Sequence, residues 1–261
     1  MSEKRGKIMQ TNMEVVSQKV IADQIYELKL KGKNVREMSA GQFLMIRPMR
    51  ADLLLRRPIS LCHIDKERET ATLLYRAGGE GTKSLAALKP GMFADVVGPL
   101  GQGFDLTLIK AGRPYLLIGG GIGVPPLYEL GRQIKARGGL VTFVNGFASK
   151  KDVFYAAEMK QIGTVHITTE DGSHGTKGYV TNVTQNLSFE PALIFSCGPH
   201  SMLTVIKQAY PATKTYLSLE ERMACGIGAC YACVCEKNTP EAGHLKVCQD
   251  GPVFRADEVR L

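Results

Sequence analysis

The chain has 261 residues, enough for two domains of ordinary size with a small third, and 44% of the residues are hydrophobic. The net charge is +8, but the basic residues are dispersed and no basic stripe with interleaved aromatic residues occurs, which argues against nucleic-acid binding. The charged opening leads into no apolar stretch and no apolar run can cross a bilayer, so the sequence predicts no secretory signal, no membrane span and a cytoplasmic location.

Residues 12 to about 103 have the pattern of short β-strands. The segments with this pattern are 13–16, 25–30, 43–46, 53–55, 72–75 and 94–97. Because Gly, Pro and Asn separate them, we expect a compact antiparallel β-barrel, which we take as a first domain over residues 1–103. Residues 81–88 predict a turn that opens a short helix, closed by Pro90 and Gly91.

Two short motifs in this predicted barrel contain groups that can bind a diphosphate. Arg57-Pro58-Ile59-Ser60 places a guanidinium near a hydroxyl, and Gly81-Thr82 stands at the start of the predicted helix. A guanidinium binds two phosphate oxygens at once, and the backbone N–H groups at a helix start point toward an anion. An arginine that only forms a salt bridge on a strand explains these residues equally well.

From Tyr115 onward, buried strands alternate with helices. The runs 115–118, 140–144, 165–168 and 192–196 are typical of parallel strands, and residues 153–162 and 201–209 have helical character. This order predicts a doubly wound α/β domain, for which we take residues 104–217.

A glycine-rich loop, Gly119-Gly120-Gly121-Ile122-Gly123-Val124-Pro125, follows the first strand of this domain. Glycines let the backbone approach a pyrophosphate, and a proline in the first helical turn costs no hydrogen bond. The order of strand, loop and helix favours a nucleotide site. The spacing is not G-x-G-x-x-G, so the usual rule for an acidic ribose-binding residue does not carry over.

Later strand ends supply further candidates. Cys197-Gly198-Pro199 lies at the carboxyl edge of the predicted sheet, where ligands collect, although a buried structural thiol also explains Cys197. Residues 169–173 end another strand and are compatible with a plain turn. Lys150 and Lys151 either meet a 2′-phosphate or face water, so the choice between NAD and NADP stays open.

The last segment, residues 218–261, contains a C-x4-C-x2-C motif and one further cysteine, which is the spacing of plant-type 2Fe-2S centres. Small residues such as Gly226 and Gly228 let backbone N–H groups approach an anionic cluster. A four-cysteine zinc site is the alternative, but zinc ligands usually form two matching pairs. The segment is too short for a hydrophobic core of its own, so we expect the cluster to help hold it together, and Cys235 to be a packed thiol.

Taken together, three sets of motifs resemble those of the ferredoxin-reductase superfamily. They are R-P-x-S and G-T in the predicted barrel, G-G-G-x-G-x-x-P and C-G-P in the predicted α/β domain, and the cysteine-rich tail. More narrowly, the chain is similar from about Met13 onward to the electron-transfer subunits of class 1B NAD-dependent dihydroorotate dehydrogenases. The resemblance implies FAD and a 2Fe-2S cluster as cofactors and NAD as substrate. The implied FAD site is Arg57, Pro58, Ile59, Ser60, Leu74, Tyr75, Arg76, Gly81 and Thr82; the implied cluster ligands are Cys225, Cys230, Cys233 and Cys248; and the implied NAD site is Gly119, Gly120, Gly121, Gly123, Val124, Pro125, Cys197, Gly198 and Pro199.

In the resembled enzymes of pyrimidine biosynthesis, a separate FMN-containing barrel subunit oxidises dihydroorotate, and electrons pass through the cluster and FAD to NAD. A flavin is needed because nicotinamide takes two electrons as hydride, whereas the cluster gives one. The resemblance therefore implies an oxidoreductase subunit with a catalytic partner subunit, two of each in a heterotetramer. We assign no side chain of this chain as acid or base.

Two other functions stay open from the sequence. The small subunit of an NADH-dependent ferredoxin:NADP oxidoreductase or of a sulfide dehydrogenase is also similar to the chain. In that relative one cluster ligand is typically Asp, whereas this chain offers four cysteines. The other is a non-enzymatic, zinc-bearing nucleotide-binding module.

Overall fold

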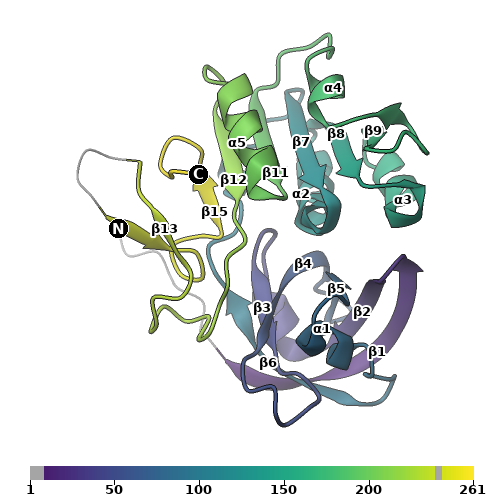
Figure 1. Ribbon diagram of the computed structural model, residues 1–261, viewed down its shortest axis with the longest axis vertical. Coiled ribbons are helices and arrows are strands. Elements are labelled where there is room, and N and C mark those ends of the chain that lie inside the picture. Colours follow the sequence, from purple (N-terminus) through teal and green to yellow (C-terminus); the bar gives the residue numbers. More distant parts are fainter. Residues whose placement is uncertain (1–8, 239–242) are drawn as a thin grey trace.

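The computed structural model describes residues 9–238 and 243–261 and places them in three regions. A barrel lies below an α/β sheet, and the C-terminal segment lies beside both (Figure 1). This arrangement confirms the predicted fold class. No helix in these residues is long and apolar enough to cross a membrane.

The barrel is closed and six-stranded. Parts of β1 and β6 alternate buried positions with more exposed ones as the sequence predicts, whereas β3 is buried throughout and β5 is buried at every position except its ends. A short 3-10 helix, η1 (Lys33–Glu37), and a short helix, α1 (Glu80–Leu85), connect its strands. In order around the barrel, the strands are β1 (Gln10–Ala22), β2 (Ile25–Lys31), β5 (Thr70–Arg76), β4 (Arg57–Asp65), β3 (Phe43–Ile46) and β6 (Phe93–Leu100).

The predicted strand at residues 53–55 is wrong, because this run lies in the loop between β3 and β4. Arg50 forms an ion pair with Asp52 at 2.6 Å, and the backbone N–H of Leu53 donates to the Arg50 carbonyl at 3.2 Å. These contacts close a turn where a strand would need extended backbone. Leu54 is 84% exposed, so its apolar character reflects no core position.

The α/β region is a seven-stranded sheet in which only the last strand is antiparallel to its neighbour. Its order is β10 (Thr176–Lys177), β9 (Thr164–Thr169), β8 (Leu140–Phe147), β7 (Pro114–Gly120), β11 (Leu193–Cys197), β12 (Thr215–Ser218) and β15 (Val253–Arg255). The connections include η2 (Leu106–Leu108), η3 (Gly121–Gly123), α2 (Val124–Ala136), η4 (Lys150–Asp152), α3 (Ala156–Lys160), α4 (Thr181–Thr184) and α5 (His200–Ala209).

The two faces of this sheet are covered by different helices, as a doubly wound fold requires. Tyr115 and Leu117 of β7 pack in one cluster with residues of α2 and α3. The intervening Leu116 and Ile118 pack with residues of α4 and α5 on the other face. Successive strand residues point to opposite faces, which explains why both sets are apolar.

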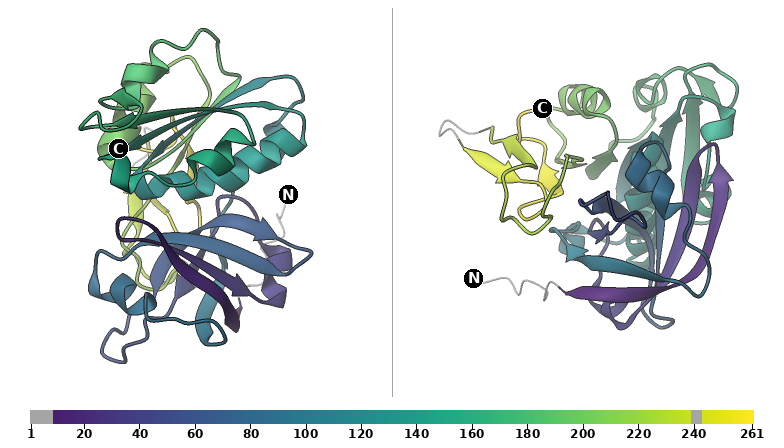
Figure 2. Two further views of the ribbon diagram at one scale, coloured as in Figure 1. Left: turned by 90° about the vertical axis from the view of Figure 1, so that its right-hand side faces the viewer. Right: turned by 60° about the horizontal axis from the view of Figure 1, so that its bottom comes forward.

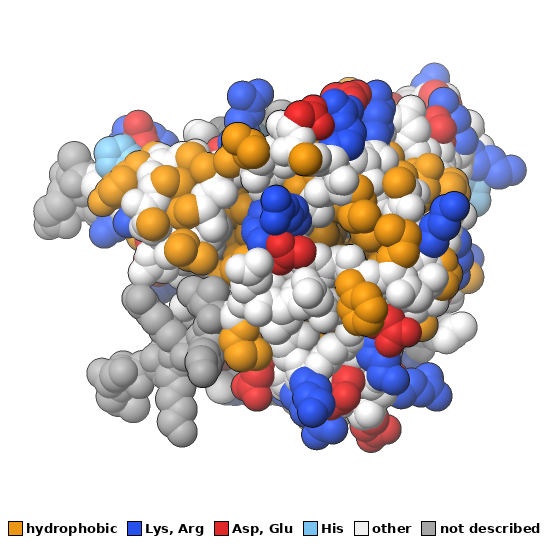
Figure 3. Space-filling view, turned by 90° about the horizontal axis from the view of Figure 1, so that it is seen from below, with side chains coloured by type: hydrophobic (Ala, Val, Ile, Leu, Met, Phe, Trp, Pro, Cys, Tyr) orange, Lys and Arg blue, Asp and Glu red, His pale blue; other side chains and the backbone are white. Residues whose placement is uncertain are grey.

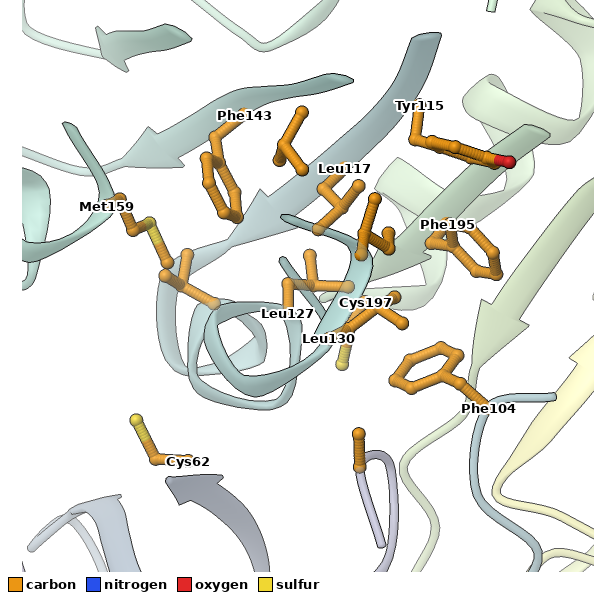
Figure 4. Close-up of a cluster of buried hydrophobic side chains, with 14 of the residues drawn as sticks. Cys62, Phe104, Tyr115, Leu117, Leu127, Leu130, Phe143, Met159, Phe195 and Cys197 are labelled. Carbon is orange, nitrogen blue, oxygen red and sulfur yellow. The ribbon is translucent and has the colours of Figure 1, made fainter. Parts of the chain in front are cut away.

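Helix α2 also joins the sheet to the barrel. Figure 4 shows Leu127 and Leu130 of this helix between the sheet and Cys62 of β4. Glu129 on the same helix is fully buried and accepts hydrogen bonds from the backbone N–H of Ile64, at 3.2 Å, and from Gln133, at 2.8 Å. The barrel and the α/β region therefore share one core.

The C-terminal segment has one small sheet of its own, formed by β13 (Val234–Glu236) and β14 (His244–Lys246). Its apolar residues pack in a single cluster with Phe43, Met45 and Leu100 of the barrel and with Leu203 and Leu217 of the α/β region. The two further views place this segment against both neighbours (Figure 2). The core that the segment lacks by itself is thus partly supplied by the other two regions.

Candidate functional site

The four cysteines of the C-terminal motif lie in two pairs. The Sγ atoms of Cys225 and Cys230 are 3.3 Å apart in the loop before β13. Cys233 and Cys248 form a side-chain hydrogen bond with each other. Cys233 precedes β13 and Cys248 follows β14, and the pairing of these strands brings the two residues together.

This pairing bears on the choice between the two metals that the sequence left open. Among the described residues, no three His, Cys, Asp or Glu side chains converge as ligands of a single metal ion. A structural zinc site needs four ligands around one ion, whereas a 2Fe-2S cluster takes two thiolates on each of two irons. Two pairs of thiols match the two thiolates that each iron of a 2Fe-2S cluster takes.

The cysteine loop, residues 225–233, is shaped by two glycines in the left-handed region, Gly226 with φ 71° and Gly228 with φ 81°. A Cβ on Gly226 would lie 2.7 Å from Met45 Cγ, and one on Gly228 would lie 1.8 Å from Gln249 Oε1. Only glycine fits both positions without displacing a neighbour. The loop is thereby held against β3 of the barrel.

The thiols of the two pairs have different acidities. Burial raises the pKa of Cys225, but hydrogen bonds from the backbone N–H groups of Cys230, at 3.3 Å, and Ile227, at 3.4 Å, outweigh it and lower the pKa to about 6. Burial and the hydrogen bond with Cys233 raise the pKa of Cys248 to about 12. Metal ligands must be deprotonated, so Cys225 is prepared for a metal by its loop, whereas Cys248 depends on the metal itself.

In the barrel, the structure brings together the two motifs that the sequence suggested for a diphosphate, residues 57–60 and Gly81-Thr82. A Cβ on Gly81 would lie 2.0 Å from Nε of Arg57, so this guanidinium lies directly against the first turn of α1. Arg57 donates to the carbonyl of Leu55 at 2.5 Å, and no carboxylate in the described residues pairs with it. The salt-bridge interpretation of Arg57 therefore finds no partner here, and the cation is available to an anion.

The other residues expected at this site differ in whether their side chains or only their backbone can contact a ligand. Ser60 is half-buried on β4, and Arg76 is exposed at the end of the adjacent β5. Ile59, Leu74 and Tyr75 have buried side chains. Tyr75 donates its hydroxyl to Gln18 at 3.0 Å. These three residues can therefore line a site only with their backbone.

At the carboxyl edge of the sheet, the glycine loop after β7 and the turn after β11 touch each other. A Cβ on Gly123 would lie 2.4 Å from the carbonyl oxygen of Cys197, and one on Gly198 would lie 3.0 Å from the N atom of Gly120. The side chain of Cys197 is buried, and burial raises the pKa of its thiol. Val124 is buried as well. The glycine backbone, and not these side chains, forms the surface of this edge.

A pocket of about 520 Å³ opens beside these two loops. It includes Gly120, Gly121 and Pro199 from the expected set, together with Arg76 of the barrel. Glu170 belongs to the strand end 169–173 that the sequence offered. The remaining residues come from the ends of β8 and β9, from the segment that leads into α4, and from α5, and sequence reasoning missed them: Gly146, Phe147, Ala148, Thr168, Gly178, Tyr179, Val180, Thr181, Ser201, Met202 and Val205. The rule that ligands collect at carboxyl strand ends, applied to the end of β8 as well, would have indicated Gly146, Phe147 and Ala148.

The two lysines that were candidates for a 2′-phosphate lie outside this pocket. Lys150 is exposed and its backbone N–H donates to Ser173 at 2.7 Å. Lys151 forms an ion pair with Asp23 at 3.1 Å. Arg76, which does line the pocket, lies 3.5 Å from Asp152.

Comparison with known proteins gives two family matches. The iron-sulfur cluster binding domain of dihydroorotate dehydrogenase B matches residues 220–260. The oxidoreductase NAD-binding domain matches residues 117–208. The "Dihydroorotate dehydrogenase B (NAD(+)), electron transfer subunit" of Listeria innocua is 59% identical over 254 residues, covering 97% of this chain and all of the relative. The subunit of the same name from a Geobacillus species is 52% identical over 254 residues, covering 97% and 99%.

Two solved structures are similar in fold. An NADH-dependent reduced ferredoxin-NADP oxidoreductase, described for flavin-based electron bifurcation, has a TM-score of 0.84 at 28% identity, covering 96% of this chain and 90% of that one. A ferredoxin NADP+ reductase from Neisseria gonorrhoeae has a TM-score of 0.65 at 15% identity, covering 77% and 90%. At 15% identity, the similarity to the Neisseria gonorrhoeae reductase concerns the fold alone.

Proposed function

Because this chain belongs to the family of dihydroorotate dehydrogenase B electron transfer subunits, we propose that its three regions form one electron path from a catalytic partner subunit to NAD. The relatives confirm the family resemblance, and with it an oxidoreductase subunit that works with a dihydroorotate dehydrogenase partner. We propose that the partner contains FMN, that the assembly has two copies of each subunit, and that it works in pyrimidine biosynthesis.

One spatial relationship carries this proposal. Gly226 of the cysteine loop packs on Met45 of β3, and Met45 is the direct cross-strand neighbour of Pro58 in β4. The loop proposed for the cluster is therefore one strand away from the residues proposed for FAD. Arg76, from the strand next to β4, in turn lines the pocket proposed for NAD. The three proposed sites adjoin each other in the order that electron transfer requires.

We propose the following binding residues for the cluster, FAD and NAD. Cys225 and Cys230 would bind one iron, and Cys233 and Cys248 the other. Arg57, Ser60 and Arg76, with the backbone of Gly81 and Thr82, would hold FAD. The backbone of the glycine loop and Pro199 would hold the NAD diphosphate. When bound, the cluster exchanges single electrons, and the flavin converts between single electrons and the hydride that NAD carries.

The chain contributes binding, orientation and charge to this chemistry. Arg57 supplies a positive charge that no described carboxylate neutralises, which suits a diphosphate. The backbone N–H groups at Cys225 hold negative charge on sulfur. Glycine at positions 119–121 and 123 allows close approach of a pyrophosphate, as at other α/β nucleotide sites.

We place the partner subunit against the cysteine loop, because single electrons must reach the cluster from outside. Ile227 and Tyr231 of this loop are 47% and 69% exposed, so the loop offers apolar side chains to a partner. In the view from below, hydrophobic side chains gather over the part of the face where the C-terminal segment lies (Figure 3). We also propose a cytoplasmic location, since all seven cysteines are free and such thiols persist in a reducing compartment.

The two alternative functions are not favoured. The similar ferredoxin-NADP oxidoreductase structure shares 28% of its residues with this chain, whereas the dihydroorotate dehydrogenase subunits share more than half. The match of residues 220–260 to an iron-sulfur cluster binding domain argues against a zinc module.

The test is purification of the chain from cells that contain its natural partner, under anaerobic conditions. We expect FAD, two irons per chain and a co-purifying dihydroorotate-oxidising FMN subunit, with a native mass that corresponds to two of each. A colourless protein with zinc, or a large iron-sulfur flavoprotein as the partner, would overturn the proposal.

A further inference from the structure

We propose that Glu170 makes the pocket at the sheet edge selective for NAD over NADP; this inference rests on the proposed function. Glu170 follows β9 directly, and its backbone N–H donates to the carbonyl of Phe147, the last residue of β8, at 3.1 Å. Both residues line the pocket. Arg76 and Glu170 are the only charged residues among those that line it in the described part of the chain.

The carboxylate of Glu170 is available to a ligand. The side chain is exposed, and no described cation lies within ion-pair distance of it. The neighbouring acids are already engaged: Asp171 accepts hydrogen bonds from the backbone N–H and hydroxyl of Ser173, at 2.9 and 2.6 Å. Asp152 lies 3.5 Å from Arg76. Among the described residues that line the pocket, Glu170 is thus the single acidic group, and no ion pair holds it away from a ligand.

The position of Glu170 matches the adenosine end of a bound dinucleotide. The glycine loop follows β7, and Glu170 follows β9, two strands away in the sheet. Neighbouring strands lie about 4.8 Å apart, so the two strand ends are separated by about 10 Å. This separation fits a diphosphate on the glycines and the adenosine ribose near β9. Tyr179, which also lines the pocket, is 64% exposed and offers an aromatic surface for a base.

The two coenzymes differ at this ribose. In NAD the 2′ position carries a hydroxyl, which can donate a hydrogen bond to a carboxylate. In NADP it carries a phosphate, whose negative charge a carboxylate repels. A site for the phosphate would need an unpaired cation. Arg76 is the one cation among the described residues that line the pocket, and it lies 3.5 Å from the carboxylate of Asp152, while Lys150 and Lys151 lie outside the pocket. The stem of Lys177 lies beside Gly172, and this lysine does not line the pocket either.

The test compares Glu170→Gln with Asp171→Asn, each in the full chain loaded with FAD. Asp171 does not line the pocket, so the control removes the same charge one residue away and keeps the acceptor oxygen for Ser173. Steady-state reduction of ferricyanide by NADH and by NADPH gives kcat/KM for both donors. Calorimetry with AMP and with 2′-phospho-AMP measures binding without electron transfer.

We expect Glu170→Gln to narrow the preference for NADH over NADPH by about tenfold or more, with a matching gain in relative affinity for 2′-phospho-AMP. Asp171→Asn should keep the preference of the unchanged chain. Equal preferences in all three proteins would overturn the inference but leave the proposed function intact. Failure of both donors to reduce the unchanged chain would instead contradict the proposed function.

Discussion

The Nζ atom of Lys246 lies 2.7 Å from the carbonyl oxygen of Gly228, in the middle of the cysteine loop. The same ammonium lies 4.3 Å from the ring centroid of Tyr231. The peptide that begins with this carbonyl ends at the N–H of Ala229, which hydrogen-bonds to Cys225. Lys246 therefore holds in place a peptide that points at a proposed cluster ligand, and it adds a positive charge beside it.

Replacement of this lysine is expected to change the cluster's potential. Reduction adds a negative charge to the cluster, and a nearby cation stabilises that charge, so Lys246→Met should make the midpoint potential more negative. Lys246→Arg keeps the charge and should lie between the two. A redox titration followed by electron paramagnetic resonance measures the cluster, and the visible spectrum follows FAD, whose potential should not move. Identical cluster potentials in Lys246→Met and the unchanged chain would contradict this role.

The cluster itself should depend on Cys230, one of its four proposed ligands, and not on the nearby Cys235. Cys230→Ser is expected to lose the cluster absorbance and electron transfer with the partner, while FAD stays bound and NADH still reduces artificial dyes. Cys235→Ser is the matched control, because this thiol is buried in β13 and burial raises its pKa to about 11. An iron assay and a visible spectrum of each variant check the prediction. Normal transfer by Cys230→Ser without a cluster would refute it.

Arg57 is expected to contribute strongly to FAD affinity. A charge-assisted hydrogen bond contributes roughly 1.5–3 kcal/mol, so Arg57→Ala should weaken FAD binding by about one to two orders of magnitude. Arg36→Ala provides the control, since Arg36 is exposed and pairs with Glu69 at 2.7 Å on another part of the barrel. Titration of the apoprotein with FAD, followed by flavin fluorescence, gives both dissociation constants. If the two variants bind FAD equally well, Arg57 has no part in the site.

Local sequence patterns predicted five of the six barrel strands and β7, β8, β9 and β11 of the α/β sheet, but not β4, β10, β12 or β15. Alternation predicted the barrel, and continuous apolar runs predicted the strands of the α/β sheet. The run 53–55 failed because the ion pair between Arg50 and Asp52 closes a turn there. The placement of β15 in the α/β sheet also went unpredicted, because its partner β12 lies far away in sequence.

The residues of the candidate sites also fall into two classes, those that a local motif indicates and those that only the fold brings together. The cysteine spacing and the glycine loop are contiguous in sequence, so both could be recognised from sequence alone. For Glu170 the sequence shows only a strand end, and for Tyr179 it shows nothing, because several strand ends meet in the folded sheet to form their pocket. The contact between Arg57 and Gly81 joins residues on different elements, and only their separate chemistry hinted at it. Long-range contacts of this kind have no local pattern.

Glu129 is the clearest case of a residue whose role only the fold defines. Its buried carboxylate lies 2.9 Å from the ring of His63 in β4 and 3.0 Å from Arg132, and it accepts the backbone N–H of Ile64. Burial by itself raises the pKa of this carboxyl, but the hydrogen bonds from His63 and Gln133 and the charge of Arg132 outweigh it and lower the pKa. A lowered pKa in the folded state means that the ionised form contributes stability above the unfolded value of 4.5.

We therefore expect Glu129→Gln to destabilise the chain at pH 7 by about 1–3 kcal/mol, because it leaves the groups around position 129 without their charged acceptor. The sign of the pH dependence follows from the lowered pKa. The unchanged chain loses this contribution as the pH falls below 4.5 through the folded pKa, so the difference between the two proteins should shrink there. Urea unfolding at pH 7 and at several acidic values measures both free energies. Glu158→Gln, an exposed carboxylate on α3, should change neither curve. A difference that stays constant with pH would show that the ionised carboxylate does not join the barrel to the sheet.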